Sequence, residues 1–330
     1  MTKSEFVQKK WGVFCHYLHS LHNGNGPHNT RGQVTSWEEC VNELNVEKLA
    51  SQISDLGAGY LVFTMQQGSR HFIAPSRSFV EATGLTDACS SRDLVLDLSS
   101  ALSKRGIDLF LYYTGDGMPR DAEPEVCKRF GWQQGTEISW DLVKMWSEPL
   151  REYSLRYGNK VSGWWLDGMY DAIGYTDEKL LHFRQAAQAG NPDALIANNY
   201  YGCFVPDSGK EVQIDGKNVI LADFYQNIAP PTPFCDFTAG EVVQFNAYPD
   251  PTRTWDVVPH VLSFLGIPEK AWEVYAGWGA GGCKYSPEYM ARYIQGVNHL
   301  GGVVSVDMRL YRDGSLEDAQ RRALELVGKV

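Results

Sequence analysis

The chain has 330 residues, of which 43% are hydrophobic and 21% are charged, and its formal net charge at pH 7 is -10. This length is enough for one barrel-sized domain. The acidic balance argues against a nucleic-acid-binding protein, which needs a basic surface to neutralise phosphates. The uncharged apolar runs, such as 59–65, are too short to span a membrane, so we expect neither nucleic acid nor a membrane as partner.

The amino terminus and the cysteines both bear on localisation. The first ten residues are polar and charged and show no apolar core of a secretory signal. The seven cysteines are scattered, without a C-x-x-C pair, which favours reduced thiols. We therefore expect a cytoplasmic protein. The sequence leaves homo-oligomer formation open.

The first half of the chain alternates short apolar segments with amphipathic ones. Strands are predicted over 11–18, 60–64 and 108–114, each followed by a polar loop. Helices are predicted over 46–56, 92–105 and 139–157, the last capped by Ser139 or Asp141. This alternation is typical of parallel α/β proteins.

The second half continues the pattern after an ambiguous region. Helices are predicted over 176–189, 286–300 and 315–328, and strands over 195–198 and 303–307. The sequence S-L-E-D at 315–318 is a plausible capping arrangement for the last helix. Between 203 and 279, a hairpin around Asp215-Gly216 and the segments 219–224, 242–248 and 274–278 compete for two or three strand positions.

These elements predict one α/β domain over residues 1–330. A (β/α)8 TIM-like barrel, irregular between 203 and 279, explains the length best. In such a barrel the residues that follow the strands meet at one rim, where active sites form.

Residues 161–171, V-S-G-W-W-L-D-G-M-Y-D, are the most informative stretch. A strand that is buried on both faces is predicted to end here in Asp167. An ionised carboxylate among apolar neighbours must be paired with another group or have a functional role. A helix cap or a salt bridge at the strand end is the alternative. The two adjacent indoles suggest the wall of a sugar-binding pocket, because aromatic faces pack against pyranose rings.

Five segments in order resemble glycoside hydrolase family 29, the α-L-fucosidases. W-G-V-F-C-H-Y-L at 11–18 resembles the family's F-G-x-F-x-H-W-G, and G-A-G-Y-L-V-F-T at 57–64 resembles G-A-K-Y-V-V-L-T. L-F-L-Y-Y-T at 109–114 is similar to G-L-Y-Y-S, W-L-D-G at 165–168 to W-x-D-G, and the segment from 297 resembles the family's V-S-K-G-G-N-L-L-L-N. The resemblance covers nearly the whole chain and implies a glycosidase barrel.

This sequence differs from the family at positions that bear on sugar binding. The family's K-H-H-D-G-F, with two sugar-binding histidines, is replaced by Q-Q-G-S-R-H-F at 66–72, and its asparagine in L-L-L-N is Asp307 here. We also expect no C-terminal β-sandwich domain such as many members carry. The resemblance therefore implies an α-linked terminal sugar, either fucose or a related or modified sugar.

The same resemblance implies a retaining mechanism with two carboxyl groups. Asp167 matches the family's nucleophile, and we expect donors such as Tyr113, Asn198 or His16 to hold it ionised. For the acid/base we choose Glu241, in D-F-T-A-G-E, which resembles the family's G-D-F-x-T-P-E loop. A loop salt bridge is the alternative for Glu241, and Asp223, Asp236 and Glu273 are reserves.

The substrate-binding candidates lie on aromatic positions and after strands. His16 matches the family's histidine that binds sugar hydroxyls, and Arg70 could meet an acidic group on a modified sugar. Packing is the alternative for each tryptophan, and turn formation is the alternative for the two asparagines. The full set is His16, Trp37, Gln66, Gln67, Arg70, His71, Tyr113, Trp165, Asn198, Asn199 and Trp255, with Trp278 as a further pocket tryptophan.

We expect no cofactor and no metal. The H-x-x-H spacing of His16, His19 and His22 suits a helix better than a strand that runs into a loop, and no acidic or cysteine pattern accompanies it. The glycine-rich stretches 24–32 and 277–282 match neither the dinucleotide fingerprint nor the P-loop. Besides a glycosidase, two hypotheses stay open: a catalytically silent carbohydrate-binding barrel, and a barrel lyase or isomerase with Asp167 as base.

Overall fold

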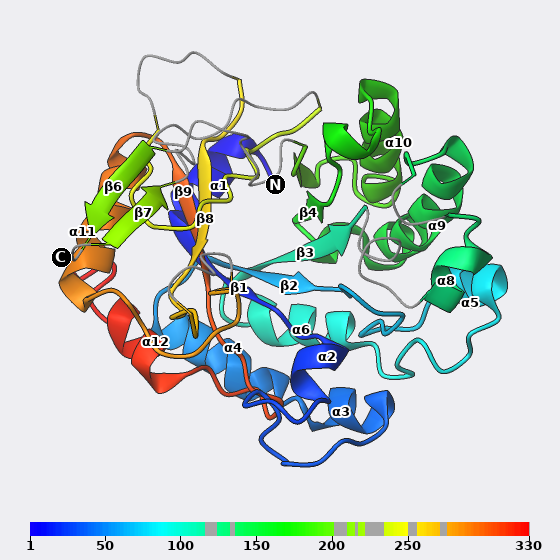
Figure 1. Cartoon of the computed structure of the whole chain (residues 1–330), viewed down its shortest axis with the longest axis horizontal. Helices are drawn as coiled ribbons and strands as arrows, with labels where there is room; N and C mark the ends of the chain where they lie inside the picture. The colour runs from blue at the N-terminus through cyan, green and yellow to red at the C-terminus, as the bar shows by residue number, and fades with distance from the viewer. Residues whose placement is uncertain are drawn as a thin grey trace.

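The structure is a computed structural model of the chain and describes residues 1–115, 124–132, 136–200, 210–214, 217–221, 234–249, 256–270 and 276–329. Strands occupy the middle of the molecule and helices lie around them (Figure 1). In the described residues, no helix combines the length and the apolar character that crossing a membrane requires.

Seven strands form one sheet in the order β5-β4-β3-β2-β1-β9-β8, and every neighbouring pair is parallel. The strands of this sheet are β1 (Trp11–Cys15), β2 (Tyr60–Thr64), β3 (Asp108–Thr114), β4 (Gly163–Asp167), β5 (Leu195–Asn198), β8 (His260–Phe264) and β9 (Val303–Asp307). Because all these strands run the same way, their carboxyl ends meet at one rim of the sheet.

The predicted eight-stranded barrel is not confirmed, because the described residues give this sheet seven strands. The residues 236–242 nevertheless hydrogen-bond to both of its edges. Asp236 N donates to Ile196 O of β5 at 2.7 Å, and Leu262 N of β8 donates to Gly240 O at 2.8 Å. We call residues 236–242 the bridging segment.

Most of the helices lie around the outside of the sheet (Figure 1). Those before β4 are α1 (Lys3–Lys9), α2 (His19–His22), α3 (Trp37–Glu43), α4 (Val46–Asp55), α5 (Arg77–Thr83), α6 (Leu94–Ser103), α8 (Pro124–Arg129) and α9 (Trp140–Tyr157). Those after β4 are α10 (Asp177–Ala187), α11 (Pro287–His299) and α12 (Asp318–Leu324), with short 3-10 turns at Gly158–Lys160 and Asp171–Ile173.

The sheet separates two hydrophobic cores, because successive side chains of a strand point to opposite faces. The outer core, between strands and helices, contains Tyr113 and Leu166, whereas the inner core contains their neighbours Tyr112 and Trp165. Phe6 of α1 fills the inner core beside Tyr60, the first residue of β2, with ring centroids 5.2 Å apart. The pocket described below lies toward the opposite ends of the strands.

Four strands agree with the prediction residue for residue, namely β2, β3, β5 and β9. The first strand ends at Cys15 rather than at 18, because Leu18 already precedes the short helix α2. Strand β8 was not predicted. Its sequence H-V-L-S-F contains a histidine and a serine that are buried in the structure.

The ambiguous region contains the predicted hairpin. Strand β6 (Lys210–Ile214) pairs antiparallel with β7 (Lys217–Leu221) in a separate two-stranded sheet. The predicted segment 219–224 therefore does not supply a strand of the main sheet in its described part, and 242–248 forms no regular strand. Of 274–278, the described residues 276–278 lie in a turn.

The predicted helices occur with ends that agree or are shifted by one to four residues. Ser139 caps α9 by accepting from Leu142 N, as expected. The last helix is shorter than predicted and begins at Asp318 without a side-chain cap, so the capping role of S-L-E-D was wrong. Ser315 instead donates to the Asp313 carboxylate, which belongs to the preceding turn.

Candidate active site

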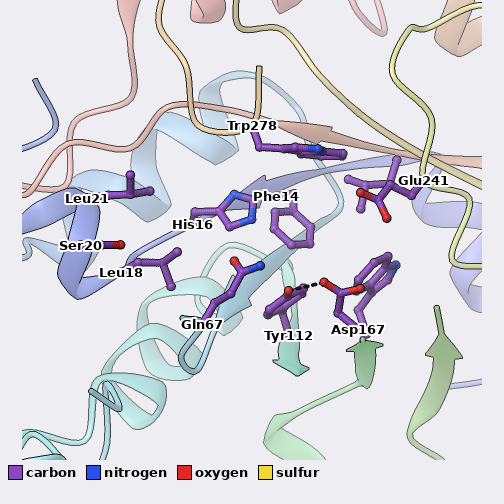
Figure 2. A pocket seen from close by; sticks show the side chains of 12 residues that line it. Phe14, His16, Leu18, Ser20, Leu21, Gln67, Tyr112, Asp167, Glu241 and Trp278 are labelled. Atoms are coloured by element: carbon purple, nitrogen blue, oxygen red, sulfur yellow. Dashed lines mark hydrogen bonds between the residues drawn. The ribbon is translucent and has the colours of Figure 1, made fainter. Parts of the chain in front are cut away.

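A pocket of about 210 Å³ opens at the carboxyl ends of the parallel strands, and Figure 2 shows the side chains around it. Its lining is mainly apolar on one side and carries two carboxylates on the other. The lining residues are Phe14, His16, Leu18, Ser20, Leu21, Gln67, Tyr112, Trp165, Asp167, Glu241, Leu262 and Trp278.

Asp167 is the last residue of β4 and is held by four hydrogen-bond donors. The Tyr112 hydroxyl donates to Oδ2 at 2.5 Å. Oδ1 accepts from the Gly168 amide at 2.7 Å, from Asn199 Nδ2 at 3.0 Å and from the Tyr170 hydroxyl at 3.3 Å. Four donors on its two oxygens fix the orientation of this carboxylate.

The local sequence explains this arrangement. Gly163 begins β4 where a Cβ would lie 2.4 Å from the Phe110 ring, so β3 and β4 can approach closely there. After Asp167 the chain turns through Gly168 at a φ of +67°, which suits glycine because other residues meet steric strain there. That turn directs the Gly168 amide back to the carboxylate.

Glu241 approaches the same place from the bridging segment. Its Oε2 accepts from Asn199 Nδ2 at 2.7 Å, so one amide group links the carboxylates of Asp167 and Glu241. The two linked oxygens therefore lie no farther apart than the sum of these two bond lengths. Figure 2 shows both carboxylates at one end of the pocket, below and beside Trp278.

The backbone at Glu241 is held by β8 without being a regular strand. Glu241 forms an isolated parallel bridge with Leu262, and Val242 N donates to Leu262 O at 2.9 Å. His260 adds side-chain contacts, because its Nδ1 lies 3.0 Å from Thr238 O and 3.1 Å from Ala239 O, while its Nε2 lies 2.8 Å from Ser305 Oγ. Burial lowers the pKa of His260 to about 4, so the ring is neutral near pH 7.

Aromatic rings form the inner wall of the pocket. Tyr112 and Trp165 stack with centroids 5.5 Å apart, and Phe14 meets Trp165 edge-on at 6.2 Å. The Trp165 indole donates to Ala239 O, which ties β4 to the bridging segment. Flat apolar rings beside carboxylates suit the alternating C–H and hydroxyl surfaces of a sugar.

His16 and Trp278 form the outer wall of the pocket, and contacts of Asp307 connect them. His16 Nδ1 lies 2.8 Å from Asp307 Oδ1, and the other oxygen of Asp307 accepts from Gly279 N at 2.7 Å. Trp278 precedes Gly279 and meets the His16 ring edge-on at 6.2 Å. In the described ranges, no group of His, Cys, Asp and Glu is arranged to hold a metal ion.

Seven sequence-predicted residues come together here, namely Asp167, Glu241, Asn199, His16, Gln67, Trp165 and Trp278. The expected donors to Asp167 need correction. Tyr113 is fully buried in the outer core and donates to Trp146 O. Asn198 pairs with Leu166 of β4, which faces the outer core, so the register turns Asn198 away from the side of Trp165.

The remaining candidates lie behind or beside the pocket. Trp37 is buried and its indole donates to Phe72 O, while His71 stacks on His19 with centroids 3.8 Å apart. Gln66 is buried and its Nε2 donates to Thr114 Oγ1 at 3.0 Å. Arg70 lies 3.9 Å from the Asp87 carboxylate. Trp255, like Asp223 and Glu273 among the reserve carboxylates, lies outside the described residues.

Sequence reasoning missed Tyr112 and Tyr170 as partners of Asp167. Tyr112 aligns with Trp165 in the register of β3 and β4, and side chains in register share a face. The alternation of strand faces, counted back from Trp165, is the signal that identifies Tyr112. Asp236, a reserve carboxylate, instead forms an ion pair with Arg184 at 3.0 Å.

No protein-family model and no curated protein sequence matches this chain. Among solved structures it is similar to the endo-fucoidan hydrolase MfFcnA4 from glycoside hydrolase family 107, with a TM-score of 0.66 and 15% identity over 98% of this chain and 53% of that one. The endo-fucoidan hydrolase P5AFcnA from the same family gives a TM-score of 0.67 and 15% identity over 96% and 89%. An α-L-fucosidase of family 29 from Bacteroides thetaiotaomicron gives 0.60 and 16% over 99% and 72%.

These likenesses concern the fold. The chain spans about half the length of MfFcnA4 and has the α/β architecture that both fucose-related glycoside hydrolase families share with it. The motifs had indicated family 29, and the structure is similar to members of two families at nearly equal identity.

Proposed function

We propose that the chain is a retaining glycoside hydrolase that cleaves an α-linked fucose or a related sugar, with Asp167 as nucleophile and Glu241 as acid/base. The observation that carries this proposal is the Asn199 amide, which hydrogen-bonds both carboxylates at 3.0 and 2.7 Å in a pocket with aromatic walls. We extend the proposal to the fold: the bridging segment occupies the eighth position of a TIM-like barrel, between β5 and β8.

The spacing of the carboxylates supports double displacement. Retaining glycosidases place the two carboxyl groups about 5–5.5 Å apart, whereas inverting enzymes need roughly 6.5–9.5 Å to fit a water molecule. The upper limit set by the two Asn199 bonds is shorter than the inverting range. Direct attack by one carboxylate therefore suits this pocket better than attack by an intervening water.

In the first step, an Asp167 oxygen attacks the anomeric carbon while Glu241 gives its proton to the departing glycosidic oxygen. In the second step, Glu241 takes a proton from water, the water oxygen bonds to the anomeric carbon and Asp167 is released. The hydrogen bonds from Tyr112 and Gly168 keep Asp167 oriented for attack. Asn199 remains in place to orient both carboxylates through the cycle.

The pocket walls support a deoxy sugar. His16 and Gln67 offer polar atoms for hydroxyl groups, whereas Phe14, Leu18 and Leu21 give the same pocket apolar surface that suits a methyl group. The similar structures act on fucose-containing substrates according to their names, and one family 29 fucosidase was trapped as a covalent intermediate with 2-fluoro-fucosyl fluoride. We propose the same sugar class for this chain.

The test is a trapping experiment with a matched activity panel. We expect 2-fluoro-fucosyl fluoride to add one fluorofucosyl group, and peptide mass spectrometry to locate it on Asp167. We also expect nitrophenyl α-L-fucoside to give the α-anomer as first product by NMR. Labelling of another residue, or a β-anomer as first product, would contradict the mechanism. Binding of fucose without turnover of any nitrophenyl glycoside would favour the silent carbohydrate-binding barrel.

A further inference from the structure

Asp307 occupies an unusual position for a buried carboxylate. It is the last residue of β9, in register with Phe14 of β1 on one side and Phe264 of β8 on the other. Its side chain is 1% exposed and accepts two hydrogen bonds from different parts of the pocket wall, the His16 ring and the Gly279 backbone. We call residues 276–282 the Trp278 loop.

The hydrogen bond to His16 fixes which ring nitrogen carries hydrogen. An ionised carboxylate only accepts hydrogen bonds, so the His16 nitrogen facing it, Nδ1, must donate. In a neutral ring the other nitrogen, Nε2, then has a free lone pair. His16 lines the pocket with its side chain 11% exposed, and within the described part of the chain no protein group bonds to Nε2.

The second hydrogen bond fixes the Trp278 loop. Gly279 N donates to Asp307 Oδ2 at 2.7 Å, and Gly279 O accepts from Arg309 Nε at 3.1 Å. Asp307, the last residue of β9, and Arg309, two residues later, therefore hold both polar groups of Gly279. Gly279 has a φ of +62°, a conformation that suits glycine, and it directly follows Trp278.

We infer that Asp307 is a positioning residue that presents His16 Nε2 to the pocket as a hydrogen-bond acceptor and locks the Trp278 loop beside it. The pocket then recognises a ligand group that donates a hydrogen bond at Nε2, while Trp278 offers a ring edge-on to His16. A sugar hydroxyl has this chemistry. The identification of the donor as a sugar hydroxyl rests on the proposed function, whereas the tautomer and the loop contact do not.

Replacing Asp307 by asparagine separates the two contacts. An asparagine can keep its oxygen toward Gly279 N and must then turn its NH₂ group toward His16, because the two ends of an amide differ in hydrogen-bond polarity. His16 Nδ1 would then accept, and the hydrogen would move to Nε2. In Asp307→Ala both contacts are lost.

The experiment measures both contacts without substrate. Protein with ¹⁵N-labelled histidine is studied by NMR at pH 7.5, with His16→Gln to assign the signals. We expect the Nδ1–H form of His16 in the parent protein and the Nε2–H form in Asp307→Asn. Hydrogen exchange of the Gly279 amide should stay slow in Asp307→Asn and become at least about tenfold faster in Asp307→Ala.

A third measurement addresses the ligand. With nitrophenyl α-L-fucoside, Asp307→Asn should raise KM about tenfold and lower kcat less, because a hydrogen bond to bound sugar is lost while the two proposed catalytic carboxylates remain. An Nε2–H or doubly protonated His16 in the parent protein, an unchanged tautomer in Asp307→Asn, or equal Gly279 exchange in all variants would each overturn the inference. If Asp307→Ala does not fold, Asp307→Asn still tests the inference. Inactivity toward every glycoside would count against the proposed function alone.

Discussion

The two carboxylates of the pocket stand on different kinds of backbone. Asp167 ends the regular strand β4, which has a parallel neighbour on each side, and four donors surround its oxygens. Glu241 lies on the bridging segment, which touches β8 through an isolated bridge and through the side chain of His260. A rigid strand thus carries one group and a side-chain-supported segment carries the other.

This difference matches the demands of the two proposed roles. A nucleophile stays ionised and must point at one atom, which fixed donors on a strand achieve. An acid/base group gains and loses a proton in each cycle, so it has to act in both protonation states. The predictions below test whether the two sides of the pocket differ in this way, in order of decreasing effect.

The largest effect is expected for Asp167. Asp167→Asn keeps the shape of the side chain but removes the proposed nucleophile, so kcat should fall by roughly 10⁴-fold or more with every substrate. The measurement is steady-state hydrolysis of nitrophenyl α-L-fucoside. Asp171→Asn is the matched control, because that exposed carboxylate caps its own turn and should leave activity unchanged. Equal losses in both variants would indicate a structural effect.

Glu241 should give a smaller loss that depends on the leaving group. Glu241→Ala is expected to lower hydrolysis of a fucosyl disaccharide by about 10²–10⁴-fold, and of a dinitrophenyl fucoside much less, because a good leaving group needs no proton. Added azide should restore turnover and yield a fucosyl azide. A loss independent of the leaving group would remove Glu241 from the acid/base role.

Asn199 hydrogen-bonds both carboxylates, so its replacement should affect both of them. Asn199→Ala is expected to lower kcat by roughly 10–100-fold, because both carboxylates lose one hydrogen bond. Combined with Glu241→Ala, the loss should be less than the product of the two single losses. Asn198→Ala, on the opposite face of β5, is the control. Independent effects of Asn199 and Glu241 would contradict the coupling.

The neighbouring tyrosines of β3 form a matched pair. Tyr112→Phe removes the 2.5 Å bond to Asp167 and should lower kcat about tenfold. Tyr113→Phe removes the buried bond to Trp146 O, so it should lower the free energy of unfolding by about 1 kcal/mol and leave kcat unchanged. Urea unfolding and kinetics on both variants test this. If Tyr113→Phe lowered kcat and Tyr112→Phe changed only the stability, the assignment of these side chains to opposite faces of β3 would be wrong.

The smallest effect concerns pH and the support of the bridging segment. The folded pKa of His260 is about 4, below the ordinary value of 6.5, so the unfolded chain binds the proton first as pH falls. Stability should therefore decrease as pH drops through 6.5, by somewhat less than about 1 kcal/mol from this group between pH 7 and pH 6. Urea unfolding at both pH values measures the change. His260→Gln should show a smaller decrease, and an equal decrease would contradict the assignment.

The sequence predicted the strands β2 and β3 more accurately than the strand β8. Strands such as β2 and β3 are unbroken apolar runs that end at a glycine or a polar loop, so their limits are visible. Strand β8 starts after Pro259 and contains His260 and Ser263, whose burial depends on tertiary partners. No local pattern reports a hydrogen bond from a neighbouring strand or loop, so this strand was missed.

The same limit applies to the pocket. Asp167 was predicted because its strand is apolar up to the carboxylate, and Glu241 because its surroundings resemble a family motif. The choice of Tyr113 over Tyr112 failed because two adjacent aromatic residues are buried on both faces of a parallel strand, which hides the alternation. The cross-strand register resolved it.

The placement of Phe6 has a consequence for how the chain matures. The Phe6 ring packs against Phe237 and His260, more than two hundred positions later in the sequence. Helix α1 therefore cannot dock until most of the polypeptide has been made, and such long-range closure slows folding.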